Sequence, residues 1–206
     1  MQRKIVEHVS DEILKRDLDK YRKSAIELGA ADAKIITTDA IVIDERVRAK
    51  CMYPRCNVYG AHANCPPYVP DIELIRKIVN NFNYAIFFKL DAPPETLVEG
   101  DIGFKQRNLE ITSKIESQAY YDGYYLALGF GGASCKSTLC LDDECCALTL
   151  GQSCRHPLKA RVTMHGVGMD VYKMATQAGW DIYPVGKSTQ PSELPCISYL
   201  GLILIY

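Results

Sequence analysis

Spacing of apolar residues predicts a series of helices along the chain. Over residues 10–28, apolar side chains recur at intervals of three and four, which predicts an amphipathic helix. Ser10 suits the N-cap of this helix, and Gly29 is expected to end it. The pattern predicts three further helices, over residues 71–81, 102–121 and 166–178.

Shorter apolar segments between these helices predict strands. Residues 84–90, YAIFFKL, are aromatic, β-branched and almost entirely apolar, so we expect a strand that is buried on both faces. Three more strands are predicted over residues 34–37, 124–130 and 197–206. Residues 38–50 fit two interpretations: a strand that continues through IVI, or a turn followed by a helix that carries Cys51.

The alternation of helices with single strands predicts an α/β fold. We expect one layered domain, residues 1–206, with a mixed sheet and no boundary to a second domain. Two segments lack any helix or strand periodicity, residues 51–70 and 131–161, and both are rich in cysteine. Loops at the ends of strands and helices are where α/β folds usually place their functional sites.

Composition and charge narrow the classes of function. The formal net charge is −1, so basic residues do not outnumber acidic ones, and we expect neither a nucleic-acid partner nor an anionic membrane partner. The longest apolar run, residues 197–206, is half the length of a membrane span. Because no apolar signal-peptide core follows the first residues, we expect a cytoplasmic protein. Its oligomeric state is left open.

Cysteine is the residue type that indicates chemistry. The chain has nine cysteines, an odd number that a closed disulfide framework would not use. In a reducing compartment, clustered cysteines are better metal ligands than disulfide partners. Eight of them fall in two groups, and only Cys196 stands apart, where a small buried apolar residue is the simpler interpretation. No single cysteine is marked as a nucleophile with a histidine base.

The second cysteine segment predicts an iron–sulfur site. Cys135, Cys140 and Cys145 are separated by four residues each, and Cys154 follows. Four thiolates on irregular backbone suit a [4Fe–4S] cluster, whose corners need ligands from different directions. Zinc is the alternative, but its structural sites favour paired Cys-x2-4-Cys turns. Cys145 is preferred to the adjacent Cys146 because it keeps the four-residue step.

The first segment predicts a second metal site with three local ligands. These are Cys51, Cys56 and Cys65, and Cys65 precedes two prolines. A fourth ligand could be Cys196, Cys146 or His62, or it could be absent, and an iron with an open position can act as a Lewis acid. A histidine in a loop, such as His62, is more often a surface or hydrogen-bonding residue than a ligand.

Charged residues near Cys154 leave two interpretations open. Arg155 and His156 either donate hydrogen bonds to a cluster sulfur or form a solvated turn held by Pro157. For Lys159 and Arg161, a solvated surface is favoured over a role in binding an anion.

Three blocks of sequence carry a resemblance to a known family. CMYPRCNVYGAHANCPPYVPD, GGASCKSTLC with CRHPLKAR, and GVGMDV resemble a family of predicted metal-binding, cysteine-rich proteins, domain of unknown function 2284. The resemblance runs from about residue 45 to the C-terminus and implies life in anaerobic bacteria or archaea. It places all seven proposed ligands on family cysteines: Cys51, Cys56, Cys65, Cys135, Cys140, Cys145 and Cys154.

One departure separates this chain from the family pattern. Where the family tends to have ARPSMEA, this chain has ARVTMHG, so His165 stands in place of an acid. The family name assigns no reaction, and whether the protein is an enzyme is left open. Three hypotheses remain: an iron–sulfur protein for electron transfer or reduction with a redox partner protein, a zinc-stabilised binding or scaffold module, and a carrier of metal or clusters.

Overall fold

The computed structural model describes residues 3–6 and 8–206, and within them five strands form one mixed sheet. The strand order across the sheet is β1-β2-β5-β3-β4. β3 and β4 are parallel, whereas the other neighbouring pairs are antiparallel. The strands are β1 (Asp32–Thr37), β2 (Tyr84–Ala92), β3 (Leu128–Gly131), β4 (Val162–Thr163) and β5 (Ile197–Leu204). The predicted α/β fold with a mixed sheet is confirmed.

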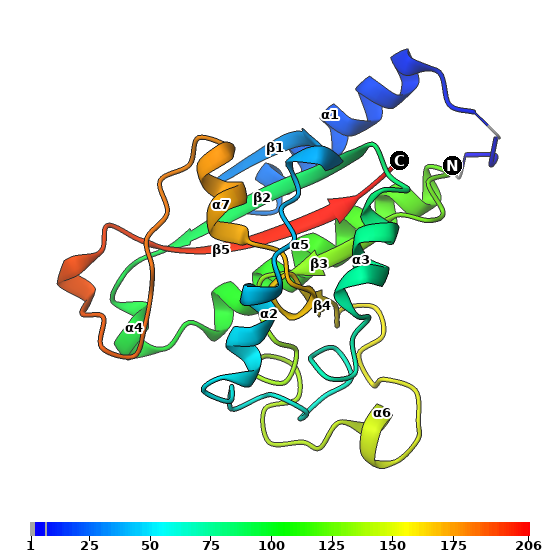
Figure 1. Cartoon of the computed structure of the whole chain (residues 1–206). Coiled ribbons are helices and arrows are strands. Elements are labelled where there is room, and N and C mark those ends of the chain that lie inside the picture. The colour runs from blue at the N-terminus through cyan, green and yellow to red at the C-terminus, as the bar shows by residue number, and fades with distance from the viewer. Residues whose placement is uncertain (1–2, 7) are drawn as a thin grey trace.

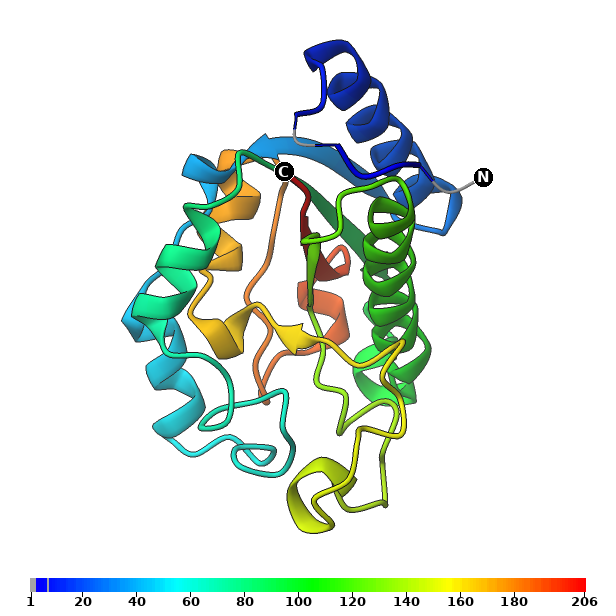
Figure 2. The ribbon, with the colours of Figure 1, turned by 90° about the vertical axis from the view of Figure 1, so that its right-hand side faces the viewer.

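Helices cover both faces of this sheet, which gives three layers (Figures 1 and 2). α1 and α5 pack on one face, and α3 and α7 pack on the other. The α-helices are α1 (Asp11–Glu27), α2 (Glu45–Met52), α3 (Ile72–Val79), α4 (Thr96–Glu99), α5 (Ile102–Tyr121), α6 (Cys146–Thr149) and α7 (Val171–Gln177). Short 3-10 helices are η1 (Thr38–Ala40), η2 (His165–Val167) and η3 (Pro191–Glu193).

β2 supplies side chains to two separate hydrophobic cores. Because successive side chains of a strand point to opposite faces, Phe87 belongs to the core under α3 and α7. Ile86 and Phe88 belong to the core under α1 and α5. All three side chains are fully buried, as predicted for a strand covered on both faces.

Local capping explains where several helices begin. The Ser10 hydroxyl accepts a hydrogen bond from the Ile13 amide at 3.4 Å, and Asp71 accepts one from the Leu74 amide at 2.8 Å. At α2, Asp44 accepts from the Arg46 amide at 2.8 Å. Residues 38–50 therefore form a turn and a helix, and that helix carries Cys51, so the alternative of a continuing strand is wrong.

Two predicted elements are shorter than expected. The helix predicted over 166–178 begins only at Val171, because Gly168 has a φ of +86°, a left-handed conformation that interrupts a helix. The strand predicted over 124–130 begins only at Leu128, which pairs with Leu204, the last residue of β5. Residues before Leu128 therefore have no β5 partner. The connection between β2 and α5, for which the periodicity predicts no element, contains the short helix α4.

Both cysteine segments lie together at one end of the molecule (Figure 1). They extend below the sheet, whereas the C-terminus and the N-terminal segment lie toward the opposite end (Figures 1 and 2). Cys51 belongs to α2, and α6 is a single turn within the second segment. None of the helices described here combines the length and apolar character needed to cross a membrane.

Candidate metal centre

The second cysteine segment leaves the sheet at Gly131 and Gly132. A buried side chain on α5, Asn108, holds this exit: its Oδ1 accepts from the Gly132 amide at 2.6 Å, and its Nδ2 donates to the Leu200 carbonyl at 2.9 Å. A Cβ on residue 132 would lie 2.1 Å from that same carbonyl oxygen, so only glycine fits. The start of the segment is thereby fixed against α5 and β5.

Beyond this exit, a lysine closes the loop around the first cysteines. The Lys136 Nζ donates to the carbonyl oxygens of Cys140 at 2.9 Å, Leu141 at 2.6 Å and Asp143 at 2.9 Å. The Gln106 side chain on α5 also donates to the Thr138 carbonyl at 3.0 Å. These bonds satisfy backbone oxygens in a segment of irregular structure. Backbone hydrogen bonds add to them: the Asp143 amide also donates to the Cys140 carbonyl at 3.2 Å, and the Cys140 amide donates to the Cys135 carbonyl at 3.2 Å.

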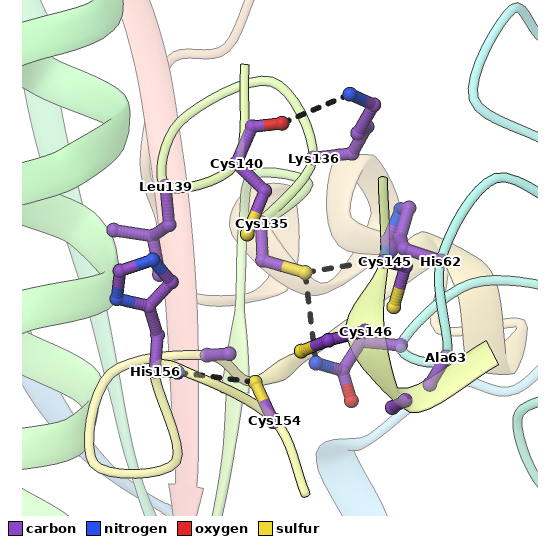
Figure 3. A pocket seen from close by; sticks show the side chains of 13 residues that line it. His62, Ala63, Cys135, Lys136, Leu139, Cys140, Cys145, Cys146, Cys154 and His156 are labelled. Atoms are coloured by element: carbon purple, nitrogen blue, oxygen red, sulfur yellow. Dashed lines mark hydrogen bonds between the residues drawn. The ribbon is translucent and has the colours of Figure 1, made fainter. Parts of the chain in front are cut away.

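Five cysteines of this segment line one cavity of about 70 Å³ (Figure 3). They are Cys135, Cys140, Cys145, Cys146 and Cys154. The wall also includes His62 and Asn64 from the first cysteine segment and the apolar side chain of Leu139. This donor set, rich in sulfur and partly shielded from water, fits a metal that prefers thiolate ligands. The residues brought together include all four that spacing predicted for the second site.

Burial and neighbouring thiols govern the acidity of these cysteines. Burial is the main cause that raises the pKa of Cys135 to about 11; a hydrogen bond from Asn64 opposes it, and the charges of Cys140, Cys154 and Cys145 act with it. Burial also raises the pKa of Cys140. In the metal-free protein these thiols therefore keep their protons near neutral pH, so metal binding must release them.

Cys146 has surroundings unlike those of Cys145, although both line the cavity. The Cys146 thiol donates to the Ser153 carbonyl at 3.4 Å, and hydrogen bonding with Arg155 lowers its pKa. By contrast, the negative charge of a Cys145 thiolate is one of the causes that raise the pKa values of Cys135 and Cys140. The choice between Cys145 and Cys146 as ligand stays a prediction.

Residues after Cys154 contact the site through both backbone and side chains. The His156 amide donates to the Cys154 sulfur at 3.4 Å, and the His156 ring lines the cavity (Figure 3). Arg155 forms an ion pair with Asp143. Arg161 forms an ion pair with Glu116 on α5 at 2.7 Å, so it serves the scaffold and not an anion site.

The three cysteines of the first segment form a second group beside the cavity. Burial, together with the charges of Cys51, Cys135 and Cys56, raises the pKa of Cys65 to about 12. Backbone hydrogen bonds shape the segment, including Cys56 N to Cys51 O at 3.0 Å and Gly60 N to Pro66 O at 2.9 Å. Cys65 interacts electrostatically with Cys135, so the two cysteine groups lie close enough at this pair for the charge of one thiolate to affect the other.

His62 joins the two segments and is the residue whose role spacing did not reveal. Its ring is buried, with Nδ1 at 3.2 Å from the Cys135 sulfur and Nε2 at 2.8 Å from the Ser134 hydroxyl. Burial, helped by the charge of Lys136, lowers the pKa of His62 to about 4. His62 is therefore neutral and hydrogen-bonded, as one interpretation of the sequence held, but it is not a surface residue.

Cys196, another candidate ligand, lies outside the cavity wall. Its sulfur is 3.9 Å from the Ser198 hydroxyl at the start of β5. Across residues 3–6 and 8–206, no group of three or more His, Cys, Asp or Glu side chains is arranged to hold a metal ion. Ligation by the seven predicted cysteines thus stays a prediction.

The comparison with protein families supplies a further finding. A family model described as predicted metal-binding protein, DUF2284, matches residues 34–205. The chain belongs to the DUF2284 family. In comparisons with curated proteins and with solved structures, nothing matched the chain.

DUF2284 membership agrees with the resemblance carried by the cysteine blocks, and it extends to β1 at the N-terminal side. All nine cysteines fall within the matched residues, because the first is Cys51 and the last is Cys196. Metal binding is thus the function predicted for the family, while the identity of the metal is a separate question.

Proposed function

We propose that this DUF2284 protein is an iron–sulfur protein that serves electron transfer or a cluster-dependent reduction. The observation that carries the proposal is the single cavity lined by five cysteines, with three more cysteines on the adjoining segment. Thiolates hold both iron–sulfur clusters and zinc, but the spacing of Cys135, Cys140, Cys145 and Cys154 favours a cluster over paired zinc turns.

Each cysteine group would hold its own cluster. Cys135, Cys140, Cys145 and Cys154 would hold one [4Fe–4S] cluster, which supplies reversible one-electron chemistry when bound. Cys51, Cys56 and Cys65 would hold a second cluster. The electrostatic interaction between Cys65 and Cys135 supports a role in which electrons pass between the two centres. A redox partner protein is part of this proposal.

The chain's own residues provide the surroundings that such a centre needs. Leu139 and the buried ring of His62 help to exclude water from the cavity. The His156 amide donates to the Cys154 sulfur, and hydrogen bonds to sulfur tune the potential of a cluster. Lys136 fixes the loop between Cys140 and Asp143 through three carbonyl oxygens.

Metal and sulfide analysis tests the proposal. We would purify the protein without oxygen and measure iron, zinc and acid-labile sulfide per chain, together with absorbance near 400 nm. Two clusters predict about eight irons and eight sulfides per chain, falling to about four of each in a Cys65→Ser variant. Zinc without sulfide would contradict the proposal and favour a zinc-stabilised scaffold.

A matched pair of variants resolves the ligand of the second site. Cys145→Ser is expected to lose the cluster of the second segment, whereas Cys146→Ser is expected to keep it. Cys196→Ser serves as the control outside the cavity and should retain the metal content of the wild type. Loss of iron in Cys146→Ser with retention in Cys145→Ser would reverse the assignment. Ready transfer of the cluster to an apo-acceptor protein would instead indicate a carrier.

A further inference from the structure

The Cys135 sulfur receives side chains from the other cysteine segment. The His62 ring places Nδ1 at 3.2 Å from this sulfur, and the Asn64 Nδ2 donates to it at 3.6 Å. Both residues lie between Cys56 and Cys65 in the first segment, whereas Cys135 opens the second. No metal ligand needs to be shared for the two segments to influence each other at this point.

Metal binding fixes the direction of the His62 hydrogen bond. A free Cys135 thiol has a proton that it can donate to Nδ1, but a thiolate bound to metal has none. The ring must then donate from Nδ1 to the sulfur. Ser134 allows this, because its hydroxyl, 2.8 Å from Nε2, can donate to that nitrogen and so favour the tautomer with its proton on Nδ1.

We propose that His62, assisted by Asn64, is a positioning residue that donates a hydrogen bond to the metal-bound Cys135 sulfur and so lets the first cysteine segment tune the metal centre of the second. This inference rests on the proposed metal centre. Donation withdraws charge from the thiolate, which stabilises the bound state and, for a cluster, favours the reduced form. Burial of His62 protects the bond from competing water.

Three histidine variants separate donation from simple packing. His62→Leu keeps an apolar side chain of similar size and removes the donor. His62→Asn keeps a side-chain N–H near the position of Nδ1. His156→Leu is the matched control, because His156 also lines the cavity but contacts the Cys154 sulfur through its backbone amide, which the substitution leaves in place.

Metal retention is the first measurement, because it applies to iron and zinc alike. Each variant, purified with its metal, is challenged with a chelator, and metal affinity is compared with that of the wild type. We expect His62→Leu to lose about 10–100-fold in affinity, as for other partners of metal ligands. His62→Asn and His156→Leu should stay close to the wild type. If iron and sulfide are present, the reduction potential of His62→Leu should also shift to more negative values.

The outcomes distinguish this inference from the proposed function. Wild-type protein that binds no metal overturns both. Wild-type protein that holds zinc without sulfide overturns the iron–sulfur function only, and the affinities still decide the role of His62. Equal metal affinity in wild type and His62→Leu overturns the inference alone. If His62→Leu fails to fold, Asn64→Ala takes its place: a smaller loss in the same direction supports the inference, and no loss contradicts it.

Discussion

Gly132 illustrates how one residue sets the entry to the cysteine segment. Its amide binds Asn108, and an added Cβ would meet the Leu200 carbonyl oxygen at 2.1 Å, a distance that backbone atoms cannot accept without moving. Because β5 is a central strand with partners on both sides, the carbonyl has little freedom to shift. This contact therefore helps to fix the position of the cysteine segment that follows.

We therefore predict that Gly132→Ala destabilises the fold. The expected loss in free energy of unfolding is about 1–3 kcal/mol, the usual cost of overpacking a well-packed site. Urea denaturation measures it. The control is Gly103→Ala in the first turn of α5, where a new Cβ meets no atom within 4 Å and alanine favours the helix. Equal stability of Gly132→Ala and wild type would contradict the close contact.

Residue types and spacing identify the cysteines in the sequence, but not the surroundings that distinguish them. The grouping of Cys135 with Cys140 follows from a short loop. The burial of His62 and its contact with Cys135 do not, because 73 positions separate the two residues and only the folded chain brings them together. His62 stands beside alanines and an asparagine in the sequence, and no periodicity marks it as buried.

At the scale of elements, the second cysteine segment depends on Lys136 for its shape. Three carbonyl oxygens between Cys140 and Asp143 converge on the Lys136 ammonium group. Charge-assisted hydrogen bonds of this kind are stronger than neutral ones. The segment contains little regular structure apart from the single turn of α6, so this one side chain adds to the short-range backbone hydrogen bonds of the loop, such as Cys140 N to Cys135 O at 3.2 Å.

We predict that Lys136→Met loosens this loop without unfolding the sheet. Amide hydrogen exchange should accelerate in residues 137–145, and the global free energy of unfolding should change by less than about 1 kcal/mol, because neither hydrophobic core contains Lys136. Lys187→Met, at an exposed position on the connection between α7 and β5, is the control. Unchanged exchange in residues 137–145 would show that the carbonyl contacts do not hold the loop.

Elements with strong local signals were predictable from sequence, whereas those set by distant partners were not. α5 spans Ile102–Tyr121, the range that its periodicity predicts. β3 is shorter than predicted because its pairing with β5 starts at Leu204, a register that local sequence does not encode. Gly168 likewise moves the start of α7 to Val171. Its left-handed backbone conformation belongs to the turn before the helix, and the apolar spacing does not reveal that turn.

At the scale of the whole molecule, a buried carboxylate ties together three distant parts of the chain. Asp17 on α1 accepts hydrogen bonds from Arg3, from Arg16 and from the Tyr124 hydroxyl at 2.9 Å. Burial by itself raises the pKa of Asp17, but the hydrogen bonds from Arg3, Tyr124 and Arg16 outweigh it and leave the pKa below its usual value. The ionised form is thus favoured in the folded state.

Stability should therefore depend on pH through Asp17. Since its native pKa lies below that of the unfolded chain, its contribution is fully present above pH 4 or so and is lost as the pH falls through the native pKa. We predict that Asp17→Asn lowers the free energy of unfolding by about 1–3 kcal/mol at pH 7 and that this difference shrinks in acid. Denaturation of both proteins at several pH values measures it.

A surface carboxylate provides the control for this pH series. Asp181→Asn, at an exposed position after α7, should change the free energy of unfolding by less than about 0.5 kcal/mol at pH 7. A difference between wild type and Asp17→Asn that stays constant from pH 7 into acid would contradict a role for the charge of Asp17. All variants are compared at the same metal content, because bound metal adds its own stabilisation.

The position of the cysteine segments has a practical consequence for immobilising the protein on a surface. Tyr206 lies toward the end of the sandwich away from both cysteine segments (Figures 1 and 2), and the Arg3 amide bonds to Tyr121 at the far end of α5. A linker joined to the C-terminus therefore leaves the sulfur-rich end facing outward. Protein tethered to an electrode through its C-terminus would present that end to the solution, and reversing the orientation requires an anchor near the cysteine segments.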